Sequence, residues 1–147
     1  MSSFLVNWVL IDQLAIGIAP SDEDDLNILK DYNIISILSL CSQDEARPPA
    51  KMNSMFNCKR IVLPDHKSNS HLTIDQLDMT IDTLRILIKQ GPVFIHCLVA
   101  IERSPIVCMH WLIKEHNLSF QDALEFMMQV HPSTSPLTSQ LNLLNNN

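Results

Sequence analysis

A cysteine and an arginine separated by five residues are the side chains of this sequence best suited to chemistry. Cys97 follows a short apolar run, and Arg103 stands just before Ser104-Pro105, where we expect a helix to begin with Ser104 as its N-cap. A loop that leads into a helix can turn its backbone N–H groups toward one point, where the helix dipole also stabilises an anion. The spacing therefore predicts a phosphate-binding loop with a nucleophilic thiol at its floor.

Hydrolysis of a phosphomonoester needs a nucleophile, a clamp for the dianion and an acid for the leaving oxygen. The inward N–H groups and Arg103 would favour the thiolate of Cys97, and the planar guanidinium can hold two phosphate oxygens. The Ser104 hydroxyl could hydrogen-bond the sulfur and ease its departure, and the His96 ring could orient the loop. Asp65, just past another predicted strand, could protonate the leaving oxygen and then activate water. A loop-capping role is the alternative for Asp65.

Composition limits the class of protein. The chain has 147 residues, of which 46% are hydrophobic and 18% charged, and this predicts one globular domain over residues 1–147. The net charge of −6, with no basic run, argues against a nucleic-acid partner and a membrane anchor. The apolar N-terminal stretch from Phe4 to Ile18 has no preceding cation and is interrupted by Asp12, so it resembles neither a signal peptide nor a membrane span. We expect a cytoplasmic protein with reduced thiols.

The cysteines give no sign of a metal site or a disulfide framework. The four cysteines include no CxxC pair and no His/Cys cluster with zinc spacing. We expect Cys41 to be a small core residue, and Cys58 and Cys108 to be structural. Whether Cys58 or Cys108 forms a disulfide with an oxidised Cys97 is left open, as is the oligomeric state.

Predicted strands and helices alternate along the chain. This order indicates an α/β fold, in a single domain, with a central mostly parallel sheet of about five strands flanked by helices. In such sheets the sites lie beyond the carboxyl ends of the strands, where both Cys97 and Asp65 fall. The predicted strands are 4–11, 14–18, 34–40, 60–63 and the run from 93; the predicted helices are 22–31 after Ser21, one after a capping box at Thr73, one after Pro105, one after Ser119, and 137–144.

The motif His96-Cys97-x5-Arg103-Ser104 resembles the signature of cysteine-based phosphatases, and the chain is similar to a compact dual-specificity phosphatase over most of its length. Leu63-Pro64-Asp65-His66 resembles the general-acid loop of that family. The resemblance implies that Cys97 forms a phosphocysteine, that Arg103 clamps the phosphate and that Asp65 is acid and then base. It assigns Ser104 as a helper hydroxyl and His96 as a supporting residue. The backbone that would cradle the phosphate belongs to Leu98, Val99, Ala100, Ile101, Glu102 and Arg103.

The resemblance also implies the substrates, which are phosphoproteins or phosphopeptides carrying phosphotyrosine and also phosphoserine or phosphothreonine. It implies neither a metal nor an organic cofactor. A phosphoinositide phosphatase is a further alternative, but polyanionic headgroups call for basic residues in the loop, and residues 98–102 contain none.

Two positions depart from the family pattern. The middle of the loop is usually Ala-Gly, whereas here it is Val99-Ala100. If that backbone must be left-handed, Ala100 costs about 1–2 kcal/mol of strain. Glu102 places a carboxylate beside the dianion site, so we expect it to point outward or to pair with a basic residue such as Arg103. These departures motivate a second hypothesis, a phosphate-binding pseudophosphatase or interaction module with little turnover.

Overall fold

The computed structural model describes residues 4–145 and contains a five-stranded sheet with the strand order β1-β2-β5-β3-β4. The first two strands form an antiparallel hairpin, and all other neighbouring pairs are parallel. The predicted α/β fold with a mostly parallel sheet is therefore confirmed. The strands are β1 (Asn7–Leu10), β2 (Leu14–Gly17), β3 (Ser36–Ser39), β4 (Asn57–Arg60) and β5 (Val93–His96).

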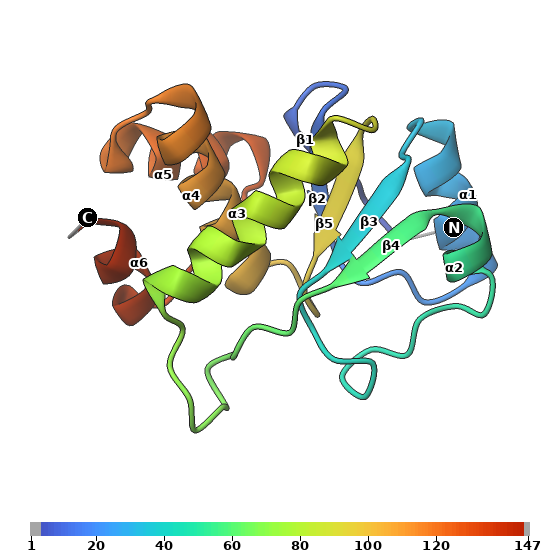
Figure 1. Ribbon diagram of the computed structural model, residues 1–147, viewed down its shortest axis with the longest axis horizontal. Helices are drawn as coiled ribbons and strands as arrows, with labels where there is room; N and C mark the ends of the chain where they lie inside the picture. The colour runs from blue at the N-terminus through green and yellow to red at the C-terminus, as the bar shows by residue number, and fades with distance from the viewer. Residues whose placement is uncertain (1–3, 146–147) are drawn as a thin grey trace.

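Helices cover both faces of the sheet. Figure 1 shows α3, α4, α5 and α6 on one side and α1 and α2 on the other. The helices are α1 (Glu23–Asp31), α2 (Met52–Met55), α3 (Ile74–Ile88), α4 (Arg103–His116), α5 (Phe120–Val130) and α6 (Thr138–Asn145).

The central strands are apolar on both faces because both faces are covered. Ile95 of β5 packs into the larger core cluster, with residues of α3 and α4 such as Leu84 and Ile106. Its neighbour Phe94 points the other way and packs with Leu26 of α1. β5 is thus buried along its whole length, and its end is a rigid platform for the loop that follows.

The predicted strand over 60–63 lies too late in the sequence. β4 ends at Arg60, and the chain then continues beside β3 through hydrogen bonds from Ile61 N–H to Ser39 O (2.9 Å) and from Leu63 N–H to Leu40 O (3.0 Å). β4 lies at the edge of the sheet and its residues are only partly buried, so polar side chains such as Asn57 and Lys59 are tolerated there. The apolar residues from Ile61 onward therefore belong to the segment that follows β4 and not to β4 itself.

Ser104 is not the N-cap of α4, contrary to the prediction. The helix begins at Arg103 with Glu102 at the N-cap, so Pro105 stands in the first turn rather than at its first position. Ser104 is fully buried, and its hydroxyl faces the sulfur of Cys97 instead of a backbone N–H. Three other helices begin at a side-chain cap: Thr73 forms a complete capping box before α3, Ser119 caps α5, and Asp22, rather than Ser21, caps α1.

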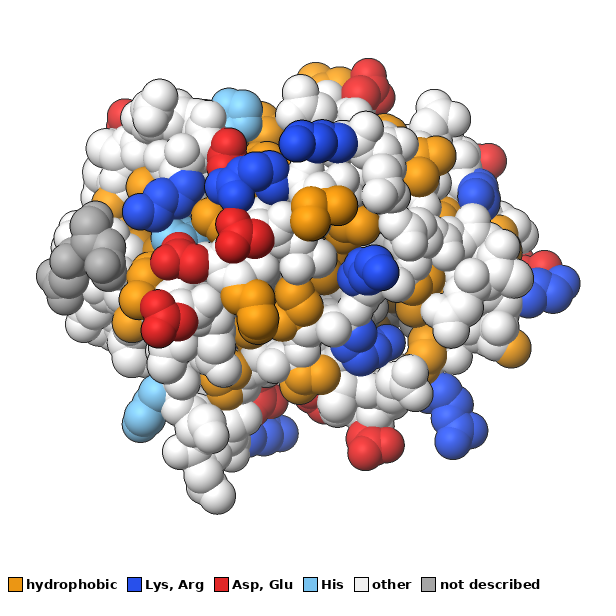
Figure 2. Space-filling view, viewed as in Figure 1, with side chains coloured by type: hydrophobic (Ala, Val, Ile, Leu, Met, Phe, Trp, Pro, Cys, Tyr) orange, Lys and Arg blue, Asp and Glu red, His pale blue; other side chains and the backbone are white. Residues whose placement is uncertain are grey.

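The carboxyl ends of the parallel strands meet at one edge of the sheet. In Figure 1 their arrows point toward the loops that connect β3 to α2, β4 to α3 and β5 to α4. On the face that carries α3, Figure 2 shows acidic and basic side chains interspersed with small hydrophobic patches. Between residues 4 and 145, no helix is both long enough and apolar enough to cross a membrane.

Candidate active site

The loop after β5 starts at a buried sulfur. Cys97 is only 2% exposed, and its Sγ lies 3.3 Å from the Oγ of Ser104. Residues 98–102 form a continuous bend that leads into α4. The Leu98 carbonyl accepts a hydrogen bond from the Ala19 N–H (3.2 Å), which fastens the loop to the end of β2. The predicted thiol and helper hydroxyl are therefore in contact, beside the N-terminus of a helix.

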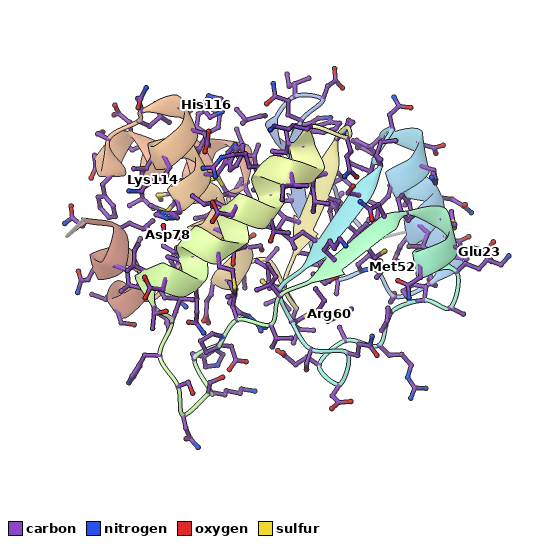
Figure 3. All side chains as sticks on the ribbon, viewed as in Figure 1. Glu23, Met52, Arg60, Asp78, Lys114 and His116 are labelled. Atoms are coloured by element: carbon purple, nitrogen blue, oxygen red, sulfur yellow. The ribbon has the colours of Figure 1, made fainter. Side chains whose placement is uncertain are left out.

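His96 supports the loop from inside the sheet. Its Nδ1 lies 2.7 Å from the Cys97 carbonyl oxygen, which can only accept, so Nδ1 carries the proton and Nε2 accepts from the Ser39 hydroxyl at 2.7 Å. Burial lowers the pKa of His96 to about 4, helped by the positive charge of Arg60, which lies at the end of β4 (Figure 3). The ring is therefore neutral near pH 7, and one tautomer fixes the backbone at the cysteine.

Arg103 is buried, and its guanidinium forms a two-point ion pair with Glu45. The distances are 2.8 Å from Nη2 to Oε1 and 3.2 Å from Nη1 to Oε2. Nη1 also donates to the Leu63 carbonyl at 3.2 Å. The hydrogen bond from Arg103 holds the pKa of Glu45 below its usual value, so this carboxylate stays ionised. Glu45 thus orients the side chain that the sequence predicts as the phosphate clamp.

The ion pair leaves one edge of the guanidinium available. Glu45 takes the edge formed by Nη1 and Nη2, and within residues 4–145 no protein acceptor is found for Nε–H. The edge formed by Nε and Nη2 can therefore present a planar two-donor fork to a phosphate.

Sequence reasoning missed Glu45, although a signal for it exists. Ser42 and Glu45 have the spacing of a capping box, and the Ser42 N–H donates to Glu45 Oε2 at 2.9 Å. The contact of this loop with Arg103 is long-range and could not be predicted from spacing.

Asp65 lies in the loop between β4 and α3 and lines the same cavity, of about 80 Å³, as Cys97 and Arg103. Its Oδ1 accepts hydrogen bonds from the Lys67 N–H (2.9 Å) and the Ser68 hydroxyl (3.1 Å). The structure thus places Asp65 near the thiol and also gives it the loop-capping contacts of the alternative interpretation.

The charge state of Asp65 follows from these contacts. Partial burial favours the neutral acid, but the hydrogen bonds from Lys67 and Ser68 outweigh it, and the pKa of Asp65 lies below its usual value. In the empty site Asp65 is therefore a carboxylate near pH 7. A phosphate dianion bound beside Asp65 would raise the pKa of this carboxyl, which is the direction that a proton donor requires.

Ala100 adopts the left-handed conformation, with φ of 60°. Its carbonyl accepts a hydrogen bond from His131 Nε2 at 2.6 Å, while His131 Nδ1 accepts from the Asn7 side chain at 2.8 Å. The next carbonyl, of Ile101, accepts from the Ser135 N–H at 2.9 Å. These contacts impose on an alanine a backbone that glycine adopts without strain.

Replacing Ala100 with glycine should relieve this strain. We expect Ala100→Gly to raise the free energy of unfolding by about 1 kcal/mol and to preserve or raise kcat/KM. Thermal unfolding and steady-state hydrolysis of p-nitrophenyl phosphate measure the two effects. A large loss of activity would show that this loop needs the alanine methyl group for its shape.

Glu102 pairs with His66 rather than with Arg103. Its Oε2 lies 2.9 Å from His66 Nδ1, and both residues line the cavity that contains Cys97. Among the other predicted loop residues, Leu98, Val99 and Ile101 are exposed, whereas Ala100 is buried.

Three further cysteines lie outside the loop that follows β5. Burial raises the pKa of the thiols of Cys41, Cys58 and Cys108, so these groups stay protonated near pH 7. All four cysteines are free. No group of three or more His, Cys, Asp or Glu side chains in the described part of the chain is arranged to hold a metal ion.

Solved structures share this architecture. A crystal structure of Tk-PTP in its active form matches with a TM-score of 0.82 and 18% sequence identity, covering 96% of this chain and 94% of that one. The structure of human tyrosine phosphatase-like serine/threonine/tyrosine-interacting protein matches with a TM-score of 0.81 and 17% identity, covering 96% and 93%. The protein thus has the fold of the cysteine-based tyrosine phosphatases.

The amino-acid sequence identifies the family within this class. The model of the dual specificity phosphatase catalytic domain matches residues 17–147, and the chain belongs to that family. It is 29% identical over 110 residues to dual specificity protein phosphatase 1 of Arabidopsis thaliana, covering 75% of this chain and 53% of that protein. It is 31% identical over 129 residues to human dual specificity protein phosphatase 7, covering 86% of this chain and 29% of that protein. The chain therefore spans about half or less of the length of these relatives.

Proposed function

We propose that this protein hydrolyses phosphomonoesters on proteins through a phosphocysteine formed on Cys97. The observation that carries the proposal is the cavity that brings the Cys97 thiol together with Arg103 and Asp65. Membership of the dual specificity phosphatase family supports the same reaction. Residues 1–147 would act as one catalytic domain, since a single sheet with a core cluster on each face carries the loops that contain Cys97, Arg103 and Asp65.

The first chemical step transfers the phosphoryl group to sulfur. The backbone of residues 98–103 and the free edge of Arg103 hold the dianion, and the Cys97 thiolate attacks phosphorus in line with the leaving oxygen. A P–S bond forms as the P–O bond breaks, and the leaving oxygen takes a proton from Asp65.

The second step hydrolyses the phosphocysteine and restores the free enzyme. The Asp65 carboxylate takes a proton from a water molecule, whose oxygen attacks phosphorus while the P–S bond breaks. The Ser104 hydroxyl, 3.3 Å from the sulfur, donates a hydrogen bond to the departing thiolate. The products are inorganic phosphate and the restored thiolate.

The surroundings of the thiol favour phosphotyrosine over shorter phosphoesters. Cys97 is buried, and Leu98 and Val99 line the cavity with side chains that are 40% and 52% exposed. An aromatic ring can lie against this apolar mouth while its phosphate reaches the sulfur. Phosphoserine and phosphothreonine are the secondary substrates in this proposal, and phosphoinositides are disfavoured because residues 98–102 carry no cation.

A cytoplasmic location belongs to the same proposal. Its support is chemical, because a catalytic thiolate needs a reducing compartment and all four cysteines are free.

A hydrolysis panel tests the proposal. Phosphotyrosine, phosphoserine and phosphothreonine peptides and a phosphoinositide are offered to the protein, and released phosphate is measured. We expect turnover of all three peptides with phosphotyrosine fastest. Tight phosphate binding without turnover of any substrate would instead support the pseudophosphatase hypothesis, and preference for the phosphoinositide would overturn the substrate class.

Asp65→Asn should separate the proton-donor role from the loop-capping role. An amide can still accept the hydrogen bonds from Lys67 and Ser68 but cannot donate the required proton. We expect hydrolysis of a phosphotyrosine peptide to slow by about 10²-fold, whereas p-nitrophenyl phosphate, whose leaving group needs little protonation, slows only a few-fold. Steady-state kcat values with the two substrates check this. Equal slowing of both would leave Asp65 with a structural role only.

A further inference from the structure

The proposed nucleophile and the proposed acid stand on two different loops, and one side-chain contact joins these loops. Oε2 of Glu102, beside Arg103, lies 2.9 Å from Nδ1 of His66, which follows Asp65 directly. The Glu102 side chain is 19% exposed and that of His66 is 51% exposed. Both residues line the cavity that contains Cys97.

The Glu102 side chain does not cap the helix that it precedes. Glu102 is the N-cap of α4, where a short polar side chain usually accepts a hydrogen bond from the first turn, but the Glu102 side chain makes no such bond. Its second oxygen, Oε1, is buried and has no hydrogen-bond partner among residues 4–145. Burying a carboxylate beside a site for a dianion is unfavourable, so the contact with His66 must compensate.

The loop that carries Asp65 is otherwise held mainly by itself. The hydrogen bonds from Lys67 and Ser68 to the Asp65 side chain, and from the Ser68 N–H to the Asp65 carbonyl (3.1 Å), fix the shape of the turn. These hydrogen bonds do not fix the position of the turn relative to Cys97. Arg103 holds the start of the loop at the Leu63 carbonyl, and the contact of His66 with Glu102 holds the turn that begins at Asp65.

We propose that Glu102 is a positioning residue that acts through His66. It holds the 65–68 turn against the phosphate-binding loop, so that the Asp65 carboxyl meets the leaving oxygen of the substrate. This inference rests on the proposed phosphatase function. The same contact explains why a carboxylate is tolerated beside Arg103, because His66, on the loop that carries Asp65, binds the Glu102 carboxylate.

The leaving group provides the test, because only a poor leaving group needs a well-placed acid. We would measure kcat/KM for a phosphotyrosine peptide and for p-nitrophenyl phosphate with the wild type, Glu102→Ala, Glu102→Gln, His66→Ala and the double alanine variant. We expect each alanine variant to slow the peptide reaction by about tenfold and the p-nitrophenyl phosphate reaction by less than about twofold. Glu102→Gln, whose amide oxygen can accept from His66, should recover most of the loss.

Two comparisons distinguish positioning from general damage. The double variant should lose no more than either single variant, because both act through one contact. Glu23→Ala is the matched control: it removes an exposed carboxylate that lies 3.1 Å from Lys51, on α1 at the edge of the molecule (Figure 3), and should change neither rate.

Equal loss on both substrates would overturn the inference, and so would additive losses in the double variant. An undiminished effect of Glu102→Ala in the Asp65→Asn protein would also overturn it, since no acid would remain to be positioned. Failure of the proposed function looks different, because the wild type would then turn over neither substrate, and both proposals would fall together.

Discussion

Cys97→Ser should abolish turnover, lowering kcat by at least about 10⁴-fold while phosphate esters still bind. A serine hydroxyl is not ionised near pH 7, so the loop would keep its anion site without a nucleophile. The substitution changes little else, since Cys97 contacts Ser104 through a single polar contact and a hydroxyl can replace the thiol there.

Cys58→Ser is the matched control for this experiment. Its thiol is partly buried beside the Met52 carbonyl, 3.6 Å away, and does not line the cavity of Cys97. We expect the control variant to keep its activity. Steady-state kcat and the affinity for a phosphotyrosine peptide should be measured for both variants. Residual turnover by Cys97→Ser within about tenfold of the wild type would exclude Cys97 as the nucleophile.

Arg103→Lys has the second largest expected effect, a loss of about 10²–10³-fold in kcat/KM. Lysine keeps the positive charge but cannot contact Glu45 through two nitrogens and also present a two-donor edge to phosphate. Both the substrate complex and the transition state therefore lose their planar clamp.

The contribution of Arg103 to phosphate binding can be measured separately from its contribution to catalysis. Inhibition by inorganic phosphate reports binding alone, and we expect its inhibition constant to rise along with the loss in kcat/KM. Arg85→Lys is the control, because Arg85 is an exposed arginine paired with Asp82 and Glu115 on the helices α3 and α4. An Arg103→Lys enzyme with unchanged phosphate inhibition would show that the guanidinium does not contact the phosphate.

The sequence predicted the fold well where the local signals were strong. The apolar run of β5 and the capping box at Thr73 each led to an element that the structure contains. The strand before Asp65 was misplaced because β4 lies at the sheet edge and is partly polar. The start of α4 was misplaced because Ser104 satisfies its hydroxyl with a sulfur rather than with the helix backbone.

The site could be predicted only in part, because some of its contacts join distant segments of the chain. Spacing identifies residues of one loop, such as Cys97 and Arg103, and a strand end identifies Asp65. The contacts of Glu45 with Arg103 and of His66 with Glu102 join segments that are far apart in the sequence, so only the folded chain shows them. Composition and local periodicity carry no information about such pairs.

Trapping the covalent intermediate tests directly whether Cys97 is the nucleophile. The reaction of wild-type protein with a phosphotyrosine peptide is quenched in acid within one turnover, and the protein is digested and examined by mass spectrometry. We expect one added phosphoryl group on the peptide that contains Cys97, and none on the corresponding peptide of Cys97→Ser. Turnover with no phosphoryl group on Cys97, or with the group on another residue, would contradict this expectation.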